Sequence, residues 1–262
     1  MAVLDKLKHK PERILLLGHT GHGKTYTATR ISVNLAKRGK KVIYLDTEKG
    51  SYDEWETLAN EGKIDEKTDK NIILIAPNDF IELKKYALDF QDQADVIVID
   101  PIRLNQFARD TAKRILVEKG IRYVGEKVVP IEDKDTYHLR GFDYQLPNEW
   151  QQELFFGLTK GKCHVIVTEL VPLKILDEVK SKYSINIDKV LTETEEIELP
   201  KKLKELFDFM GWFDKVIVLE RSMKAGKKEY YGIIVKWRGK DLSGMKIDNV
   251  IEFLLKNTKL LR

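Results

Sequence analysis

The octapeptide GHTGHGKT at residues 18–25 carries residue types that can bind a phosphate chain. It follows the apolar run RILLL (13–17) and fits the spacing G-x-x-x-x-G-K-[ST]. Glycines let successive backbone amides face a phosphate, and the helix that follows adds its positive end. In such a loop Lys24 reaches the β- and γ-phosphates, and the Thr25 hydroxyl ligates Mg²⁺. A chance glycine turn would lack this strand-and-helix context, so we predict binding of ATP and Mg²⁺.

The predicted nucleotide contacts are the residues of this loop and the one after it: Gly18, His19, Thr20, Gly21, His22, Gly23, Lys24, Thr25 and Tyr26. The two histidines occupy positions of the motif where no particular residue type is required, so a role without phosphate contact is favoured for them.

Carboxylates end two further apolar segments. DVIVID (95–100) ends in Asp100, and a carboxylate at the tip of a buried strand would hold Mg²⁺ through water. LDTEKG (45–50) places Asp46 and Glu48 at the end of another strand. The carboxyl ends of parallel strands meet at the ligand crevice, so we expect Glu48 beside the phosphate loop, one strand over. Glu48 could then act as general base on the attacking water, or it is simply a loop carboxylate.

These residues need a sheet to position them, and the apolar pattern supplies one. Short apolar segments predict strands at 13–17, 41–46, 71–76 and 95–100, and helical spacing predicts helices at 24–38, at 51–60 with Ser51 as N-cap, and from Asn78-Asp79 to about 91. This alternation is typical of βαβ units around a buried parallel sheet.

The second half of the chain is less regular. We expect a helical segment at 101–119, a loop or short hairpin at 120–146, a helix at 147–158, a strand at 163–168 and a charged surface excursion at 171–198. Two apolar runs around KAGKK (224–228) predict a β-hairpin over 214–222 and 229–238, and a helix over 246–257 closes the chain. No linker is visible, so we predict one domain over residues 1–262 with insertions at about 101–146 and 171–198.

The order of these segments resembles the RecA-like recombination ATPase core: the phosphate loop, a strand ending in DTE, then NIILIAPNDFIEL and DVIVIDP. The DTE-G strand end, PNEWQQELFFGL (147–158) and HVIVTE (164–169) resemble more closely the minimal single-core ATPases of phages and archaeal viruses, which are grouped with annealing and recombination. The resemblance covers about 13–100 and 145–240. It implies an α/β RecA-like P-loop NTPase with a mostly parallel central sheet flanked by helices and a C-terminal β-hairpin, and it makes Glu48 the catalytic base.

Two positions depart from the family pattern, and a third motif agrees with it. RecA-like recombinases carry Gln where Thr168 stands, as the γ-phosphate sensor, and the phage group carries His where this chain has Glu169. Thr168 would take the sensor role. Lys236 and Arg238 form a K-x-R spaced to share one strand face. This resembles the cationic finger that reaches a neighbouring subunit's γ-phosphate, which would require a homo-oligomer, ring or filament. The alternative is an exposed cationic strand face.

Composition sets wider bounds. Hydrophobic residues make up 42% and charged residues 34%, no run reaches the length of a membrane span, and no signal-peptide core is present. The lone Cys163 excludes an internal disulfide and fits a cytoplasmic protein. A net charge of +4 permits a polyanionic partner without proving one.

The resemblance implies that single-stranded DNA contacts the segments 120–146 and 171–198. Both mix cations and tyrosines suited to single strands, but they also hold many acids, as a solvated surface would. The cations and tyrosines are Arg122, Lys127, Lys134, Arg140, Lys174, Lys180, Lys182, Lys189, Tyr123, Tyr137, Tyr144 and Tyr183.

We therefore predict a Mg-dependent ATPase of DNA recombination, annealing or replication. Two alternatives stay open. One is a small-molecule or nucleotide kinase, for which an arginine lid would be needed over the second substrate; Arg103, Arg109, Arg114 and Arg122 could form it. The other is a regulator or mediator that binds ATP without hydrolysing it.

Overall fold

The fold is built on a central sheet of eight strands, whose order is β10-β9-β8-β1-β7-β4-β2-β3. The computed structural model describes residues 10–103, 106–182, 201–224 and 227–261. The strands of this sheet are β1 (Arg13–Gly18), β2 (Val42–Asp46), β3 (Ile72–Ile75), β4 (Val96–Asp100), β7 (His164–Leu170), β8 (Lys215–Lys224), β9 (Lys227–Trp237) and β10 (Lys246–Ile247).

The sheet is parallel except at one edge. β1 pairs in parallel with β7 and β8, and β4 pairs in parallel with β7 and β2. β9 is antiparallel to both β8 and β10, as the hairpin pattern predicts. Two strands, β7 and β4, separate β1 from β2. The expectation that Glu48 follows the strand next to the phosphate loop is therefore wrong, because apolar periodicity fixes which residues are buried but not which strands are neighbours.

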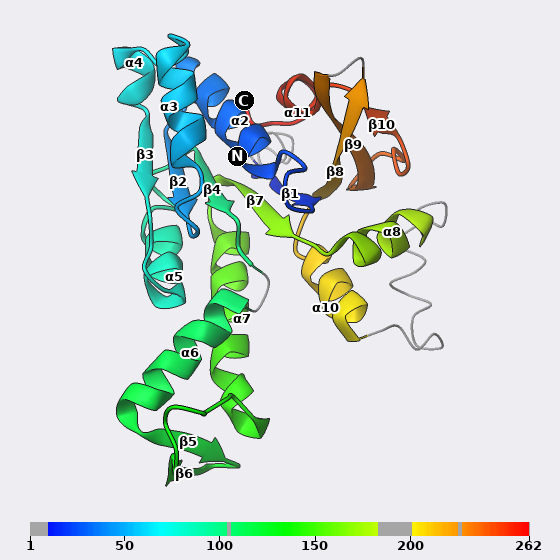
Figure 1. Ribbon diagram of the computed structural model, residues 1–262. Helices are drawn as coiled ribbons and strands as arrows, with labels where there is room; N and C mark the ends of the chain where they lie inside the picture. Colours follow the sequence, from blue (N-terminus) through cyan, green and yellow to red (C-terminus); the bar gives the residue numbers. More distant parts are fainter. Residues whose placement is uncertain (1–9, 104–105, 183–200, 225–226, 262) are drawn as a thin grey trace, which may run out of the picture.

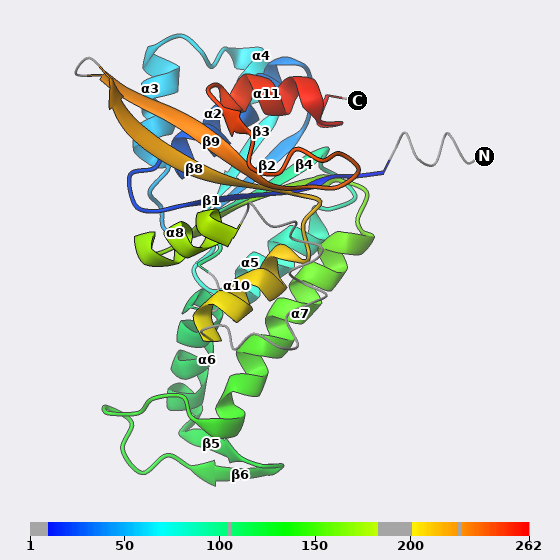
Figure 2. The same cartoon turned by 90° about the vertical axis from the view of Figure 1, so that its right-hand side faces the viewer.

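Helices cover both faces of the sheet (Figure 1, Figure 2). On one face lie α2 (Lys24–Lys37), α3 (Tyr52–Asn60), α4 (Glu66–Asp69) and α11 (Val250–Asn257). On the other lie α5 (Phe80–Asp89), α6 (Gln106–Lys119), α7 (Gln145–Lys160), α8 (Leu173–Lys182) and α10 (Lys201–Met210). Each face buries its own apolar cluster against the sheet. None of the helices in the described part of the chain is long and apolar enough to cross a bilayer.

One excursion reaches away from the sheet. α6 and α7 extend from it, and the two-stranded hairpin of β5 (Ile121–Val124) and β6 (Lys127–Pro130) lies at their far end (Figure 1). We call residues 106–160 the arm. The short helix η1 (Gly141–Tyr144) orders its tip through buried Asp143, which accepts hydrogen bonds from the Tyr123 amide at 2.8 Å and from the Tyr137 hydroxyl.

Several local predictions need correction. Ser51 stands at the N-cap position of α3, but its hydroxyl donates to Asp46 Oδ2 at 2.6 Å instead of capping the helix. Residues 246–257 are not one helix: Lys246–Ile247 pairs with β9, and α11 begins after the Asn249 cap. Of the helix expected over 101–119, residues 101–103 are not helical, 104–105 lie outside the described residues, and α6 covers Gln106–Lys119. The first part of the expected excursion at 171–198 forms α8, and 183–198 lies outside the described residues.

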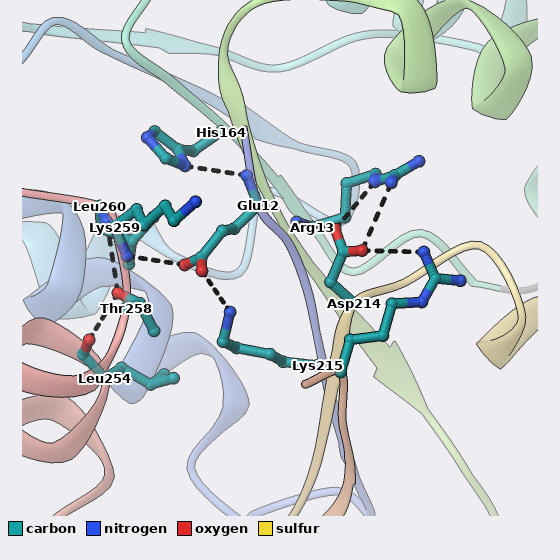
Figure 3. A network of polar contacts seen from close by, with 10 residues as sticks. Glu12, Arg13, His164, Asp214, Lys215, Leu254, Thr258, Lys259 and Leu260 are labelled. Atoms are coloured by element: carbon teal, nitrogen blue, oxygen red, sulfur yellow. Dashed lines mark hydrogen bonds and ion pairs between the residues drawn. The ribbon is translucent and has the colours of Figure 1, made fainter. Parts of the chain in front are cut away.

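A network of polar contacts lies where β1 and β8 begin, at the end of these strands that is far from the phosphate loop (Figure 3). Asp214 accepts from Arg13 Nε at 3.1 Å, and Lys215 Nζ lies 2.5 Å from Glu12 Oε1. The Glu12 amide donates to His164 Nδ1 at 3.0 Å, so the neutral ring is the form that the fold uses. Burial lowers the pKa of His164.

This histidine makes a pH-dependent contribution to stability. In the unfolded chain it takes up a proton near pH 6.5, whereas in the folded chain it does so only at lower pH, so stability is lost as the pH falls below about 6.5. His164→Asn keeps an acceptor where Nδ1 stands and cannot be protonated. We expect this variant to lose less unfolding free energy than the wild type between pH 7.5 and 5, measured by urea unfolding. The exposed His138→Asn serves as control, and equal slopes in all three proteins would contradict the assignment.

Candidate nucleotide-binding site

The phosphate loop has the backbone geometry of an anion cradle. Residues 18–25 connect the buried end of β1 to the start of α2. Gly21 and Gly23 take φ values of 77° and 81°, which side-chain-bearing residues adopt rarely. Gly23 is the N-cap of α2, and no side chain caps the helix there. The first amides of α2 are therefore free to bind an anion, which the helix dipole also favours.

Lys24 spans this loop. Its ammonium donates to the His19 carbonyl at 3.0 Å. Burial lowers the pKa of Lys24, and the negative charges of Asp100, Glu48 and Glu169 oppose that shift. The structure thus brings the predicted phosphate-binding lysine into electrostatic reach of both predicted carboxylates, and of Glu169, to which the sequence pattern assigned no role.

The two loop histidines fasten the cradle to neighbouring strands. His19 Nδ1 lies 3.3 Å from the Val171 carbonyl, just beyond β7, and His22 Nδ1 lies 3.1 Å from the Leu219 carbonyl of β8. Their rings meet edge to face with centroids 5.8 Å apart. The Nδ1 atoms therefore carry the protons and hold the loop in place, while contact of these rings with phosphate stays a prediction.

Asp100 is the central buried carboxylate of the site. Its exposed fraction is 1%, and it accepts hydrogen bonds from the Thr168 hydroxyl, from the Tyr44 hydroxyl at 2.5 Å and from the Thr25 side chain. Burial raises the pKa of Asp100, and these three hydroxyl groups counteract that rise. Three predicted residues, Thr25, Asp100 and Thr168, therefore meet at one point, joined by Tyr44, which no sequence motif marks.

The donor set suits magnesium. Hydroxyl and carboxylate oxygens are the ligands that Mg²⁺ prefers, and Mg²⁺ is usually held by one or two carboxylates together with substrate phosphates and water. Thr25 and Asp100 supply this set beside the cradle. Within the described ranges, no group of three or more His, Cys, Asp or Glu side chains is placed to hold a metal ion. The site thus fits a metal ion that binds together with phosphate.

Glu48 lies at the end of β2 in a loop joined to the end of β4. The Thr47 amide donates to the Asp100 carbonyl at 3.1 Å, and the Glu48 amide donates to Asp46 Oδ1 at 3.1 Å. The Glu48 carboxylate forms an ion pair with Arg103 through Oε1. Lys49 and Arg103 both have left-handed backbones, with φ of 57° and 49°. The ion pair between Glu48 and Arg103 therefore forms at some cost in backbone conformational energy. It engages Oε1 of Glu48 and leaves Oε2 without a contact to Arg103.

Lys236 and Arg238 lie elsewhere. β8 runs parallel to β1, and β9 returns antiparallel to β8. Lys236 and Arg238 therefore lie near the start of β8, at the end of the sheet's strands that is far from the phosphate loop. Lys236 is only 7% exposed, and its ammonium donates to the Met210 carbonyl at 3.2 Å. Arg238 follows the end of β9 and contacts Asp214 Oδ1 at 3.0 Å. Arg238 is exposed but Lys236 is buried, so the alternative of an exposed cationic face over both residues is wrong, because residue spacing does not tell which side chains are buried. A role of Arg238 in trans stays a prediction.

An aromatic pair borders the loop on its other side. The ring of Tyr230 lies 2.7 Å from where a side chain on Gly23 would begin, so only glycine fits there. Tyr26 and Tyr230 have ring centroids 5.2 Å apart, and the Arg30 guanidinium lies over Tyr26 at 4.4 Å. These three residues line part of a cavity of about 910 Å³ between α2 and the start of α11. Its size is within the range of small-molecule sites.

The hydroxyl of Tyr44 gives a direct test of the Asp100 cluster. Tyr44→Phe removes a donor that favours the ionised carboxylate, so the pKa of Asp100 should rise further. We expect Mg²⁺-dependent binding of a fluorescent ATP analogue to weaken by about tenfold at pH 7, the low end for a hydrogen bond to a charged group. As the pH is lowered, this variant should lose binding at a higher pH than the wild type does, because its Asp100 is protonated earlier. Tyr52→Phe, which changes an exposed ring, is the control. An unchanged pH profile would contradict the role of Tyr44.

The chain is similar to several known proteins. Two archaeal proteins named DNA repair and recombination protein RadB are similar to short stretches of the chain. The protein from Methanobrevibacter smithii is 33% identical over 93 residues, which is 32% of this chain and 39% of that protein. The protein from Methanococcoides burtonii is 34% identical over 67 residues, or 26% and 29%. The chain thus spans less than half the length of these relatives.

A crystal structure of a KaiC-like protein from Pyrococcus horikoshii OT3 aligns with 90% of this chain and 83% of its own, at 18% identity and a TM-score of 0.47. The family model for the central domain of helicase HerA matches residues 4–208, well over half of the 262 residues. The chain therefore belongs to the P-loop ATPase family of the helicase HerA central domain.

Proposed function

We propose that this protein binds ATP with Mg²⁺, hydrolyses it, and uses the reaction in DNA recombination, annealing or replication. One observation carries the proposal: a glycine cradle at the start of α2 lies beside a buried carboxylate, Asp100, that is hydrogen-bonded to the loop's own Thr25. Membership of the HerA family supports the ATPase reaction, and the RadB relatives are named for DNA repair and recombination.

Each residue would have a distinct task. The loop amides and Lys24 bind the β- and γ-phosphates, while Thr25 and Asp100 hold Mg²⁺, which neutralises charge on the phosphates when bound. Thr168 keeps Asp100 in place and senses the γ-phosphate. Glu48 orients water and takes its proton. In the described structure Arg103 contacts Oε1 of Glu48, so Oε2 is the oxygen that would accept from water.

The arginines favour hydrolysis over a kinase reaction. A kinase lid would gather cations over the phosphates, but Arg103 pairs with Glu48, and Arg114 pairs with Asp79 at 2.5 Å. Arg109 lies on α6 over the ring of Tyr144, and Arg122 lies on β5 at the far end of the arm. An ATP-dependent regulator that does not hydrolyse remains the second candidate.

Single-stranded DNA is the proposed macromolecular partner, and the arm is its proposed binding surface. The arm carries Arg122 and Lys127 on the β5–β6 hairpin and exposes Phe142 and Tyr144 nearby on η1. Cations that neutralise phosphates beside rings that stack bases suit single strands. A cytoplasmic homo-oligomer, with Arg238 acting across subunits, is also part of the proposal, as is kinship with the minimal ATPases of phages and archaeal viruses.

Replacing the proposed base separates hydrolysis from binding alone. Glu48→Gln should lower ATP turnover by about 10²- to 10⁴-fold, the usual contribution of a general base, with little change in ATP affinity. Phosphate release and nucleotide binding are measured side by side, with the exposed Glu56→Gln on α3 as control. Wild-type turnover in Glu48→Gln would remove the base assignment, and absence of turnover in the wild type itself would favour the regulator.

The DNA proposal has its own test. Binding of a single-stranded oligonucleotide in the presence of ATP should weaken steeply as salt rises. The double variant Arg122→Ala/Lys127→Ala should bind less tightly, with a salt slope smaller by about one for each phosphate that the variant no longer neutralises. Lys85→Ala on α5 removes an exposed cation away from the hairpin and is the control. No oligonucleotide binding at low salt would overturn this part of the proposal.

A further inference from the structure

The β8–β9 hairpin brings a second cation to the phosphate loop. β8 pairs with β1 as far as Leu17 and Val218 and then continues to Lys224, past the strand end from which the loop springs. In that extension Arg221 pairs across the hairpin with Tyr230. The hydrogen bond from His22 to the Leu219 carbonyl joins the loop to the same strand, two residues before Arg221.

This cross-strand pair covers both left-handed glycines of the loop. Nη1 of Arg221 lies 3.4 Å from where a side chain on Gly21 would begin, and the Tyr230 ring lies 2.7 Å from the equivalent point on Gly23. The guanidinium is thus in contact range of the loop backbone. Because the loop holds the β- and γ-phosphates in proteins of this class, a cation beside Gly21 is within reach of them.

The positive groups around Arg221 favour binding of an anion there. Arg221 is exposed, and no carboxylate pairs with it in the part of the chain that the structure describes. The loop that it contacts already carries the Lys24 ammonium and the positive end of α2. Arg238, by contrast, is already paired with Asp214. A bound polyphosphate would attract all of these positive groups.

We propose that Arg221 binds the terminal phosphates of the nucleotide held in its own chain, acting in cis, in addition to the role in trans proposed for Arg238. A guanidinium offers a planar fork of donors that matches phosphate oxygens and neutralises charge during phosphoryl transfer. This inference rests on the proposed ATPase function.

The first test compares three variants. Arg221→Ala should weaken ATP binding and lower turnover by about 10³-fold, the low end of what an arginine contributes in this role. Arg221→Lys should retain part of the activity, since it keeps charge but not the fork. Arg38→Ala, which removes an exposed cation at the far end of α2, should match the wild type. Thermal unfolding checks that each variant is folded.

The second test asks which chain supplies the arginine. Arg221→Ala is mixed with Lys24→Ala, and turnover is measured across protein concentration. If Arg221 acts in cis, every chain lacks one group of its own site and mixing restores nothing. Recovery of turnover on mixing, or wild-type turnover in Arg221→Ala alone, would overturn the inference. Failure of the ATPase proposal looks different: the wild type would not hydrolyse ATP, or Lys24→Ala would still bind it.

Discussion

The site depends on one buried carboxylate that several elements hold together. Asp100 ends β4, Tyr44 comes from β2, Thr168 from β7 and Thr25 from α2, and all three hydroxyl groups bond to Asp100. A buried charge without such partners would cost several kcal/mol. The hydroxyls reduce that cost and at the same time fix three strand ends and a helix start relative to each other. The cradle and the residues proposed to hold Mg²⁺ are therefore positioned before nucleotide binds.

The loops beyond this cluster extend the same frame. The ends of β2 and β4 are joined by the Thr47 amide and by the ion pair of Glu48 with Arg103. Arg103 is also the last described residue before α6, the first helix of the arm. The proposed base thus contacts the segment that leads into the proposed DNA-binding surface. The histidines fix the other side of the cradle to β7 and β8.

Much of this could be predicted because the signals are local. The phosphate loop, the strand ending at Asp100 and the C-terminal hairpin follow from spacing and apolar runs, and the structure confirms these elements. Strand order could not be derived this way, which is why Glu48 was expected next to the loop. The partners of Asp100 needed that order: Tyr44 shares a strand face with Asp46, and Asp46 lies opposite Asp100 only because β2 and β4 are neighbours.

Residue spacing also failed where burial decides the outcome. The K-x-R pattern describes Lys236 and Arg238 equally well on an exposed or a buried strand face. In the structure the lysine is buried and its ammonium donates to the Met210 carbonyl at the end of α10. Arg221 carries no motif at all. Its position follows from the length of β8 beyond the sheet edge, a property of the fold and not of any short segment.

A crystal structure of the protein with Mg²⁺ and a non-hydrolysable ATP analogue tests the central claim most directly. The Thr25 hydroxyl should leave Asp100 and ligate the metal, while Tyr44 and Thr168 still hold the carboxylate within one water of the ion. A metal ion bound away from Thr25, with the three hydroxyl groups still on Asp100, would contradict it.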